Sequence, residues 1–429
     1  MRLLQSRWAV PATVLVWLVT RAALMAVYAQ LVPGLDAGEV FADVDLYRRW
    51  SGQLRDGRVP GADPMWQYPP GAAALFVAVG WVAESTRTGY TTVFVLFALG
   101  ADLVVLLALI RLSRGGNRIA GALCWALAVP LLSLLTYARY DIFVTAPAVV
   151  ALAATVRRPA LAGATLAVGA LAKVWPAMLL ITARPLRGLR PMSIGFVTAT
   201  AVLGAVLTVS YAGAWSGFSD NQVDRGLQVE SVAATPLVLA RVADPAIVVQ
   251  YSYGAMEFIH PVATSVSAVL PAATLAGLGL LGWWWLFRGR RIDWTPTVGF
   301  DLALLAVGVA VVTSRVLSPQ YLLWLLGLAA VCLTRRDTTQ RAPAVLIVGA
   351  TVLTSAYFPW FYPDVIGTPS WPGAVLLAAR NAVLVAAIVI GLHRLLVGHR
   401  VVPQATPAAV GYRQPVGGTG GLGRIRSSS

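Results

Sequence analysis

Residues 91–112 read TTVFVLFALGADLVVLLALIRL, an apolar stretch whose charged residues are Asp102 and Arg111. As an α-helix it would be about 33 Å long, enough to cross a hydrocarbon core of roughly 30 Å. Apolar windows of similar length recur from Trp8 to Leu396. Backbone groups at membrane depth must be hydrogen-bonded within the protein, so we expect these spans to be helices. The sequence therefore predicts an all-α polytopic membrane protein.

The composition of the whole chain agrees with this class. Of its 429 residues 58% are hydrophobic and 12% charged, and the mean hydropathy is +0.73, whereas a soluble domain carries about 25% charged residues. The net charge is +15, but the arginines cluster in short runs between apolar stretches, and no basic face with interleaved aromatics is found. These runs lie at residues 111–118, 157–158, 184–190, 288–291 and 335–341. We therefore attribute the charge to membrane topology and contact with lipids, not to nucleic-acid binding.

The arginine runs also predict which segments lie on each side of the membrane. The N-terminus is expected inside, and the first apolar segment, from Trp8 to Ala29, leads outward. This segment is too long for the apolar part of a signal peptide and lacks a small-residue cleavage site, so we expect it to be retained. Two long segments, residues 31–70 and 213–263, then fall outside. The sequence thus predicts a multi-pass plasma-membrane protein with two long extracytoplasmic loops.

The end of the chain differs from the rest. Residues 401–429 are rich in Gly, Pro and Ser and show no apolar periodicity, which is typical of disordered segments. We expect a single transmembrane domain over residues 1–400, followed by a disordered cytoplasmic tail.

Two helices outside the main spans are expected near the first outer loop. Leu46, Trp50 and Leu54 fall on one face at helical spacing, which favours a short amphipathic helix in the interface. The next apolar stretch, residues 71–82, is short for a span, and a crossing there would place the arginine run at 111–118 outside. We therefore expect a surface or re-entrant helix at this position.

The apolar segment 161–183 conflicts with the charge rule. Both of its flanks are basic, so both belong inside, although the segment is long enough to cross once. Its middle reads Lys173-Val174-Trp175-Pro176, and proline interrupts a helix. We expect an inward-based hairpin with Lys173 near its tip.

A pair of acids follows the first span. In Asp43-Val44-Asp45, a carboxylate at the rim of a membrane cavity would act as general base, taking a proton from an acceptor hydroxyl. Partial burial would raise its pKa and suit it to this role. The alternative is two solvated acids that balance the charges of Arg48 and Arg49.

Lys173 is the only lysine of the chain. An ionisable residue within an apolar segment is a functional-site hypothesis, and a compact ammonium suits a phosphate. The alternatives are extension to the membrane surface or an ion pair with a carboxylate such as Asp141. Asp141 itself forms a polar pair with Arg139 at a helix boundary, either in a site or as an interfacial anchor.

Arg225, Gln228 and Glu230 lie in the second outer loop. They are candidates for binding a phosphate or sugar hydroxyls, and the alternative is the exposed charged face of an amphipathic helix. Asp102 and Arg21 lie within spans, and we assign neither a catalytic role.

Several kinds of site are excluded. No glycine-rich nucleotide loop is present and no cytoplasmic stretch is long enough for a nucleotide-binding domain, so a lipid-linked donor fits better than a soluble nucleotide sugar. Two of the three histidines, His393 and His399, lie near the inner end of the last span, which argues against a metal site. Cys124 and Cys332 both lie within apolar spans, so neither a disulfide framework nor a thiolate site is indicated. We therefore predict no cofactor.

Five groups of motifs, in order along nearly the whole chain, resemble those of glycosyltransferase family 87. That family contains integral-membrane mannosyltransferases of the GT-C superfamily that use polyprenyl-phosphate-mannose. The motifs are Asp43-Val44-Asp45-Leu46-Tyr47 with Gly57-Arg58-Val59-Pro60 and Tyr68-Pro69-Pro70, Lys173-Val174-Trp175-Pro176, Arg225-Gly226-Leu227-Gln228-Val229-Glu230-Ser231, Ser318-Pro319-Gln320-Tyr321 with Trp324, and Arg380-Asn381. One departure is Asn221-Gln222, where family members often have Tyr-His. If a histidine has a role in this region, His260 is the candidate.

The resemblance implies a GT-C-like bundle of about 10–12 transmembrane helices and an inverting transfer of mannose from the lipid carrier to an extracytoplasmic glycolipid or glycan. By the resemblance, Asp43 is the general base, with Asp45 as second candidate. Lys173 and Arg225 would bind the donor phosphate. The remaining residues expected to bind substrate are Tyr68, Arg139, Asp141, Gln228, Glu230, His260, Gln320 and Tyr321.

Three alternatives stay open. A flippase or other transporter of lipid-linked sugars needs no base and would line a path through the bilayer midplane with polar residues. A non-catalytic scaffold of an envelope assembly would not need Asp43. A transferase for another sugar on the same carrier, such as arabinose, is the third.

Overall fold

The computed structural model describes residues 8–32, 39–114, 118–223 and 225–398. Five helices are long and apolar enough to cross a membrane: α1 (Ala9–Tyr28), α4 (Tyr90–Leu112), α8 (Leu189–Ser210), α11 (Pro261–Phe287) and α16 (Trp371–Gly398). The other helices are α2 (Ala42–Arg55), α3 (Pro70–Thr86), α5 (Ala120–Ala128), α6 (Asp141–Ala154), α7 (Pro159–Ala172), α9 (Ala214–Val223), α10 (Thr235–Ala243), α12 (Pro296–Val312), α13 (Tyr321–Leu333), α14 (Arg341–Tyr357) and α15 (Pro363–Ile366). The predicted class, an all-α polytopic membrane protein, is confirmed.

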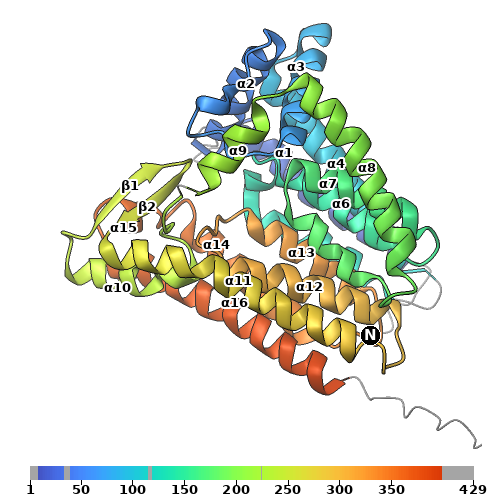
Figure 1. The fold of residues 1–429 in the computed structure, drawn as a ribbon. Coiled ribbons are helices and arrows are strands. Elements are labelled where there is room, and N and C mark those ends of the chain that lie inside the picture. Colours follow the sequence, from blue (N-terminus) through green and yellow to red (C-terminus); the bar gives the residue numbers. More distant parts are fainter. Residues whose placement is uncertain (1–7, 33–38, 115–117, 224, 399–429) are drawn as a thin grey trace, which may run out of the picture.

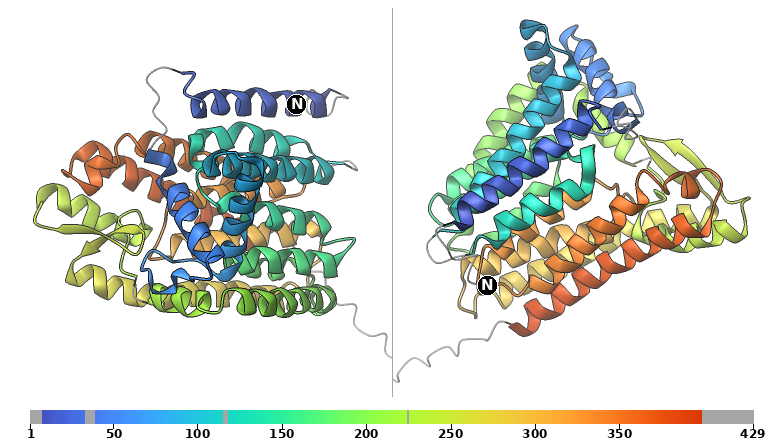
Figure 2. Two further views of the ribbon diagram at one scale, coloured as in Figure 1. Left: turned by 90° about the horizontal axis from the view of Figure 1, so that it is seen from above. Right: turned by 180° about the vertical axis from the view of Figure 1, so that it is seen from behind.

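The helices form two groups that meet along the middle of the molecule. Figure 1 shows the helices from α1 to α9 in blue to green above, and the later helices in yellow to red below. Views from above and behind show the same division, with α1 at one edge (Figure 2). α13 crosses between the groups and contacts α5 and α6, while α12 contacts the 3₁₀ segment Trp175–Thr182. The loops that the sequence places outside gather at the end of the molecule where α2, α9 and the hairpin β1–β2 lie (Figure 1).

The helix break at Lys173 is where the sequence predicts it. α7 ends there because Lys173 is extended (φ −159°, ψ 127°), and the 3₁₀ segment that follows packs back against α7. The two arms approach closely, since a Cβ added at Gly169 would lie 3.1 Å from Cγ of Pro176. The apolar segment thus forms a hairpin, and Lys173 lies at its turn.

The first outer loop is more ordered than the sequence suggests. α2 extends beyond the expected stretch, residues 46–54, and its apolar face is buried against α3 rather than left for lipid. The ring of Tyr47 stacks on Phe76 of α3, with centroids 4.3 Å apart and planes at 9°. α3 is one unbroken helix. Packing between α2 and α3 therefore fixes the helix that carries Asp43.

The second outer loop contains strands that the prediction lacked. β1 (Val248–Ser252) and β2 (Ala255–Ile259) pair antiparallel, with Val249 opposite Phe258. The predicted tail, residues 401–429, lies outside the described residues. The extent of the domain, residues 1–400, stays a prediction.

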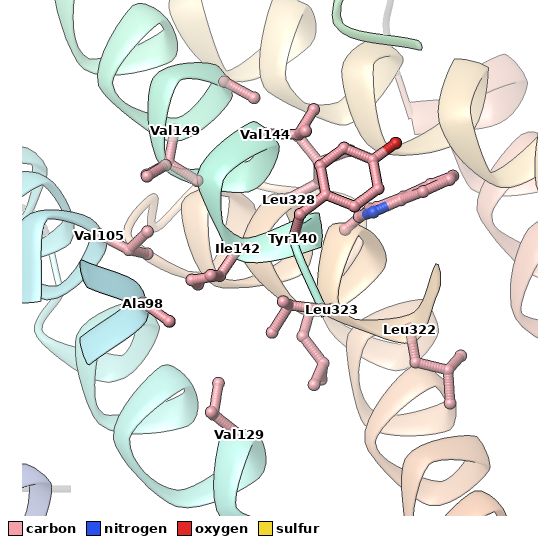
Figure 3. Close-up of a cluster of buried hydrophobic side chains, with 14 of the residues drawn as sticks. Ala98, Val105, Val129, Tyr140, Ile142, Val144, Val149, Leu322, Leu323 and Leu328 are labelled. Atoms are coloured by element: carbon pink, nitrogen blue, oxygen red, sulfur yellow. The ribbon is translucent and has the colours of Figure 1, made fainter. Parts of the chain in front are cut away.

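The main core lies where α4, α5, α6 and α13 meet. Figure 3 shows its side chains, with the ring of Tyr140 among apolar residues from these helices: Ala98, Val105, Val129, Ile142, Val144, Val149, Leu322, Leu323 and Leu328. Tyr140, the residue before α6, is thus part of this core. The core therefore supports the start of α6, where the candidate site begins.

A second structural feature is a buried ion pair between α1 and α4. Nε of Arg21 lies 2.7 Å from Oδ2 of Asp102, and both side chains are almost fully buried. Asp102 also accepts hydrogen bonds from Trp17 (3.1 Å), Trp125 (2.6 Å) and the Tyr137 hydroxyl (2.7 Å). The carboxylate is thus fully partnered, and both charges contribute to packing rather than to the site.

Candidate functional site

A cavity of about 290 Å³ lies between the two outer loops and the ends of α6, α12 and α13. It brings together side chains from the whole length of the chain. The predicted site residues that line it are Asp43, Tyr68, Asp141, Lys173, Arg225, Gln320 and Tyr321. The helix ends and loops around it come from both groups of helices.

Asp43 is held in the first turn of α2 by an arginine behind it. Oδ2 of Asp43 lies 3.0 Å from Nε of Arg139, and the Asp43 side chain is 33% exposed. Arg139 is in turn fixed by the carbonyl oxygen of Val40, 2.8 Å from its Nη1. Arg139 does not line the cavity. It orients the carboxylate, and the exposed part of Asp43 remains open to a hydroxyl in the cavity.

Lys173 pairs with Asp141, one of the alternatives that the sequence left open. Its Nζ lies 2.7 Å from Oδ1 of Asp141, which also accepts a hydrogen bond from Nε1 of Trp324 (2.8 Å). The ammonium also faces the rings of Tyr140, Tyr321 and Trp324, at 4.8, 4.9 and 4.7 Å from their centroids. An aromatic face attracts a cation. The charge of Lys173 is therefore already compensated at the cavity wall.

Arg225 is a cation of the cavity whose ion pair is long. Its side chain is 10% exposed, and its Nε lies 4.0 Å from Oε1 of Glu257. Among the described residues this Nε has no hydrogen-bond partner. Glu257 instead accepts from the backbone N–H of Gly226 at 3.0 Å. A nearly buried guanidinium with an unused donor is suited to binding an anion.

Arg315 lies beside Arg225 and was missed by the sequence reasoning. It lines the cavity and donates to the backbone oxygen of Gln222. Its pKa is lowered, mainly by burial and then by the positive charge of Arg225. Two guanidiniums, those of Arg225 and Arg315, therefore line the same cavity. The sequence signal was weak, because Arg315 ends a span and belongs to no recognised motif.

Gln228 and Glu230 do not line the cavity, which corrects the prediction. Gln228 instead holds the loop after α12: its N–H donates to the Arg315 carbonyl (3.0 Å), and its Oε1 accepts from the Leu317 N–H (2.9 Å). Its Nε2 donates to Oγ of Ser318 (3.3 Å) and to Oε2 of Glu230 (3.2 Å). Both residues are buried. They hold in place the loop that carries Arg315, but they do not themselves face the cavity.

Asp45 and His260 also lie away from the cavity. Asp45 is exposed on α2, where its carboxylate is 3.7 Å from Arg48. The ring of His260 accepts the N–H of Val262 at 3.2 Å and so caps α11. Positions two residues apart on a helix point to nearly opposite sides, which separates Asp45 from Asp43.

Asn221 and Gln222, the departure from the family pattern, join the two outer loops. Nδ2 of Asn221 donates to the carbonyl oxygens of Asp63 and Trp66, both at 3.0 Å. Nε2 of Gln222 donates to Oε1 of Gln67, also at 3.0 Å. These amides therefore hold the first outer loop against α9, and this contact is made without a histidine at either position.

Burial raises the pKa of Glu230 to about 7, while Arg380 and the bond from Gln228 lower it. The folded protein then binds more protons than the unfolded chain between the ordinary glutamate pKa and about pH 7. Stability therefore falls as the pH rises through this window, by up to about 3 kcal/mol. We expect the Tm in detergent to fall between pH 5 and 8, and to fall less in Glu230→Gln.

The matched control for this prediction is Glu84→Gln, because the Glu84 side chain is 66% exposed. It should show the same fall in Tm as the wild-type protein. An equal fall in Glu230→Gln and in wild type would mean that Glu230 is ionised without penalty.

Within the described ranges, no group of three His, Cys, Asp or Glu residues is placed to hold a metal ion.

Residues 66–319 match the sequence model of glycosyltransferase family 87. The matched region includes Tyr68, Asp141, Lys173, Arg225 and Arg315, whereas Asp43 lies well before its start and Gln320 directly after its end. Neither a curated protein nor a solved structure matches the chain.

Proposed function

This chain belongs to glycosyltransferase family 87, and from that premise we propose that it moves a mannosyl residue from a polyprenyl-phosphate carrier to a glycolipid or glycan acceptor. The transfer inverts the anomeric centre and takes place on the extracytoplasmic side of the plasma membrane. Asp43 is the general base.

The observation that carries the proposal is that one cavity holds a carboxylate and two guanidiniums from distant parts of the chain. Asp43 comes from α2, and Arg225 and Arg315 come from loops after α9 and α12. A glycosyl transfer from a phosphate needs a base for the acceptor and cations for the departing phosphate. Lys173, compensated by Asp141, serves as a secondary cation.

A lipid-linked donor is supported by the apolar part of the cavity wall. This wall is formed by Val307, Ala310 and Val311 of α12, together with Val174 and Met178 of the hairpin that follows α7. Val174 is 53% exposed. An isoprenoid chain would lie against this wall while its phosphate reaches the arginines.

The proposed reaction is a single displacement. The acceptor hydroxyl oxygen attacks the anomeric carbon as its proton passes to Asp43, and the bond between that carbon and the phosphate oxygen breaks. The bonding electrons leave with the phosphate, whose charge Arg225 and Arg315 stabilise. Attack opposite the leaving group converts a β-linked donor into an α-linked product.

The proposal is tested with purified protein, envelope lipids and labelled polyprenyl-phosphate-mannose or polyprenyl-phosphate-arabinose in parallel. We expect label from the mannosyl donor in a new product, and much less product from Arg225→Gln. Transfer from the arabinosyl donor alone would show that the sugar moved is arabinose and not mannose. A labelled nucleotide sugar is run as a third donor. Transfer from it, with no transfer from either lipid donor, would overturn the proposal.

The sidedness of the site is a separate prediction. In a Cys124→Ser background, we expect Ser219→Cys on α9 to react with a membrane-impermeant maleimide in intact cells. Arg187→Cys, in the loop before α8, should react only after permeabilisation. Both native residues are exposed, so accessibility within the protein does not limit either reaction. The reverse pattern would place the cavity on the cytoplasmic side.

A further inference from the structure

Two tyrosines at the tip of the β1–β2 hairpin have no part in the chemistry proposed above. Tyr251 belongs to β1, and Tyr253 lies in the turn that leads to β2. Both line the cavity, whereas Gln250 and Ser252 do not. Alternate residues of a strand share a face. The hairpin therefore presents its tyrosine face to the cavity, and Figure 1 shows it beside α9.

The hairpin tip lies next to the first outer loop, which includes the helix that carries Asp43. A Cβ added at Gly254 would lie 3.8 Å from Cε of Met65 in the first outer loop. The pKa of Tyr251 is raised by burial first and by the negative charge of Asp43 second. Tyr251 and Asp43 also line the same cavity. A molecule held against the hairpin would therefore lie beside Asp43.

The backbone at the tip does not favour tyrosine. Tyr253 has φ 47° and Gly254 has φ 76°, the two left-handed residues typical of a type I′ hairpin turn. Asn, Asp and Gly suit the first of these positions, and a bulky aromatic residue there is an outlier. Residues held in such conformations are found at ligand sites more often than elsewhere. Folding alone would favour asparagine, so the tyrosine ring points to a role in the cavity.

The surroundings of the two rings are those of a site for a sugar. Tyr251 is 55% exposed although it lines the cavity, so its ring is available at the open side. Phe218 of α9 adds a third aromatic side chain, and Gln67 and Gln222 add amide groups. An aromatic ring offers an apolar face with a polar rim, and amides both donate and accept. Rings suited to the C–H face of a sugar therefore gather here, while the two amides bind each other, since Nε2 of Gln222 donates to Oε1 of Gln67.

We propose that the hairpin tip is the acceptor subsite, and that Tyr251 and Tyr253 are the residues that set the position of the acceptor in the cavity. Tyr251 and Tyr253 hold a sugar ring of the acceptor so that one of its hydroxyls faces Asp43. This inference rests on the proposed function, because it takes the acceptor hydroxyl to be the group that Asp43 deprotonates. The arginines bind the donor phosphate at a separate wall, so the two substrates use different parts of the cavity.

The test compares kinetics with a synthetic acceptor, octyl α-D-mannoside, and with the mannosyl lipid donor. Tyr253→Asn keeps a residue that suits the turn and removes the ring. We expect it to raise the acceptor KM about tenfold, a loss of roughly 1.4 kcal/mol, while the donor KM and Tm stay near wild type. Tyr251→Ala should also raise the acceptor KM, and Tyr251→Phe should restore most of the affinity. The matched control Gln250→Ala changes an exposed residue outside the cavity and should behave as wild type.

Phosphatidylinositol and a serine-containing peptide serve as alternative acceptors. Transfer to either of these but not to the glycoside would overturn the inference, and so would an unchanged acceptor KM in Tyr253→Asn and Tyr251→Ala. Both outcomes leave the proposed function standing, because the wild-type protein still transfers sugar. Failure of the wild-type protein to transfer from any lipid-phosphate sugar would overturn the proposed function, and the subsite with it.

Discussion

Replacing Asp43 with asparagine is expected to lower kcat by about 10²- to 10⁴-fold, with the donor KM close to wild type. The amide preserves the size of the side chain but does not take a proton from the acceptor. Arg139, which lies 3.0 Å from the carboxylate, would keep a hydrogen-bond acceptor in the amide oxygen, so we expect the protein to stay folded with a modest fall in Tm. The measurement is the initial rate of label transfer at saturating donor, together with the Tm of each protein.

Asp45→Asn provides the matched control, two positions further along the same helix. Asp45 is exposed and lies 3.7 Å from Arg48, so its rate should stay within about twofold of wild type, as for a surface ion pair. Loss of activity in Asp45→Asn with activity retained in Asp43→Asn would show that the base is misassigned. Loss in both with lowered Tm would indicate damage to α2.

Replacing Asp102 with leucine is expected to have the largest effect on stability. The change leaves the guanidinium of Arg21, which is 2% exposed, without its carboxylate, and it removes the acceptor for two tryptophans and Tyr137. Breaking a buried pair in this way costs about 3–5 kcal/mol. We expect a large fall in Tm and in the yield of folded protein from the membrane.

The double variant Asp102→Leu with Arg21→Met separates the charge from the packing. Removing both charges should recover a substantial part of the lost Tm, since no uncompensated ion remains. Leu103→Ala, a change at a 38% exposed neighbour, should change the Tm little. A double variant no more stable than Asp102→Leu would contradict the account of Arg21.

The spans and the helix break were predictable because their causes are local. Hydropathy over a window of about 20 residues identifies a span, and proline at position 176 ends the hairpin arm near Lys173. The resemblance also brought several correct cavity residues together in advance, among them Asp43, Lys173 and Arg225. Each of these stands in a recognisable motif.

What could not be predicted depends on contacts between distant segments. The strands β1 and β2 are five residues each, too short for a periodic signal, and the Tyr253-Gly254 turn was the one local sign of them. Gln228 stands in a motif, but only the packing of the outer loop against residues 315–318 reveals that it supports that loop. The same packing places Arg315 at the cavity, which the sequence alone does not reveal.

The central claim, that the cavity transfers sugar rather than passing the lipid-linked sugar across the membrane, is tested most directly in proteoliposomes. Vesicles that contain wild-type protein, Asp43→Asn or no protein would receive labelled polyprenyl-phosphate-mannose and octyl α-D-mannoside. We predict labelled dimannoside with wild type and almost none with Asp43→Asn or empty vesicles. Movement of intact donor between leaflets by both proteins, with no labelled product from any polyprenyl-phosphate sugar, would contradict the claim and favour a flippase.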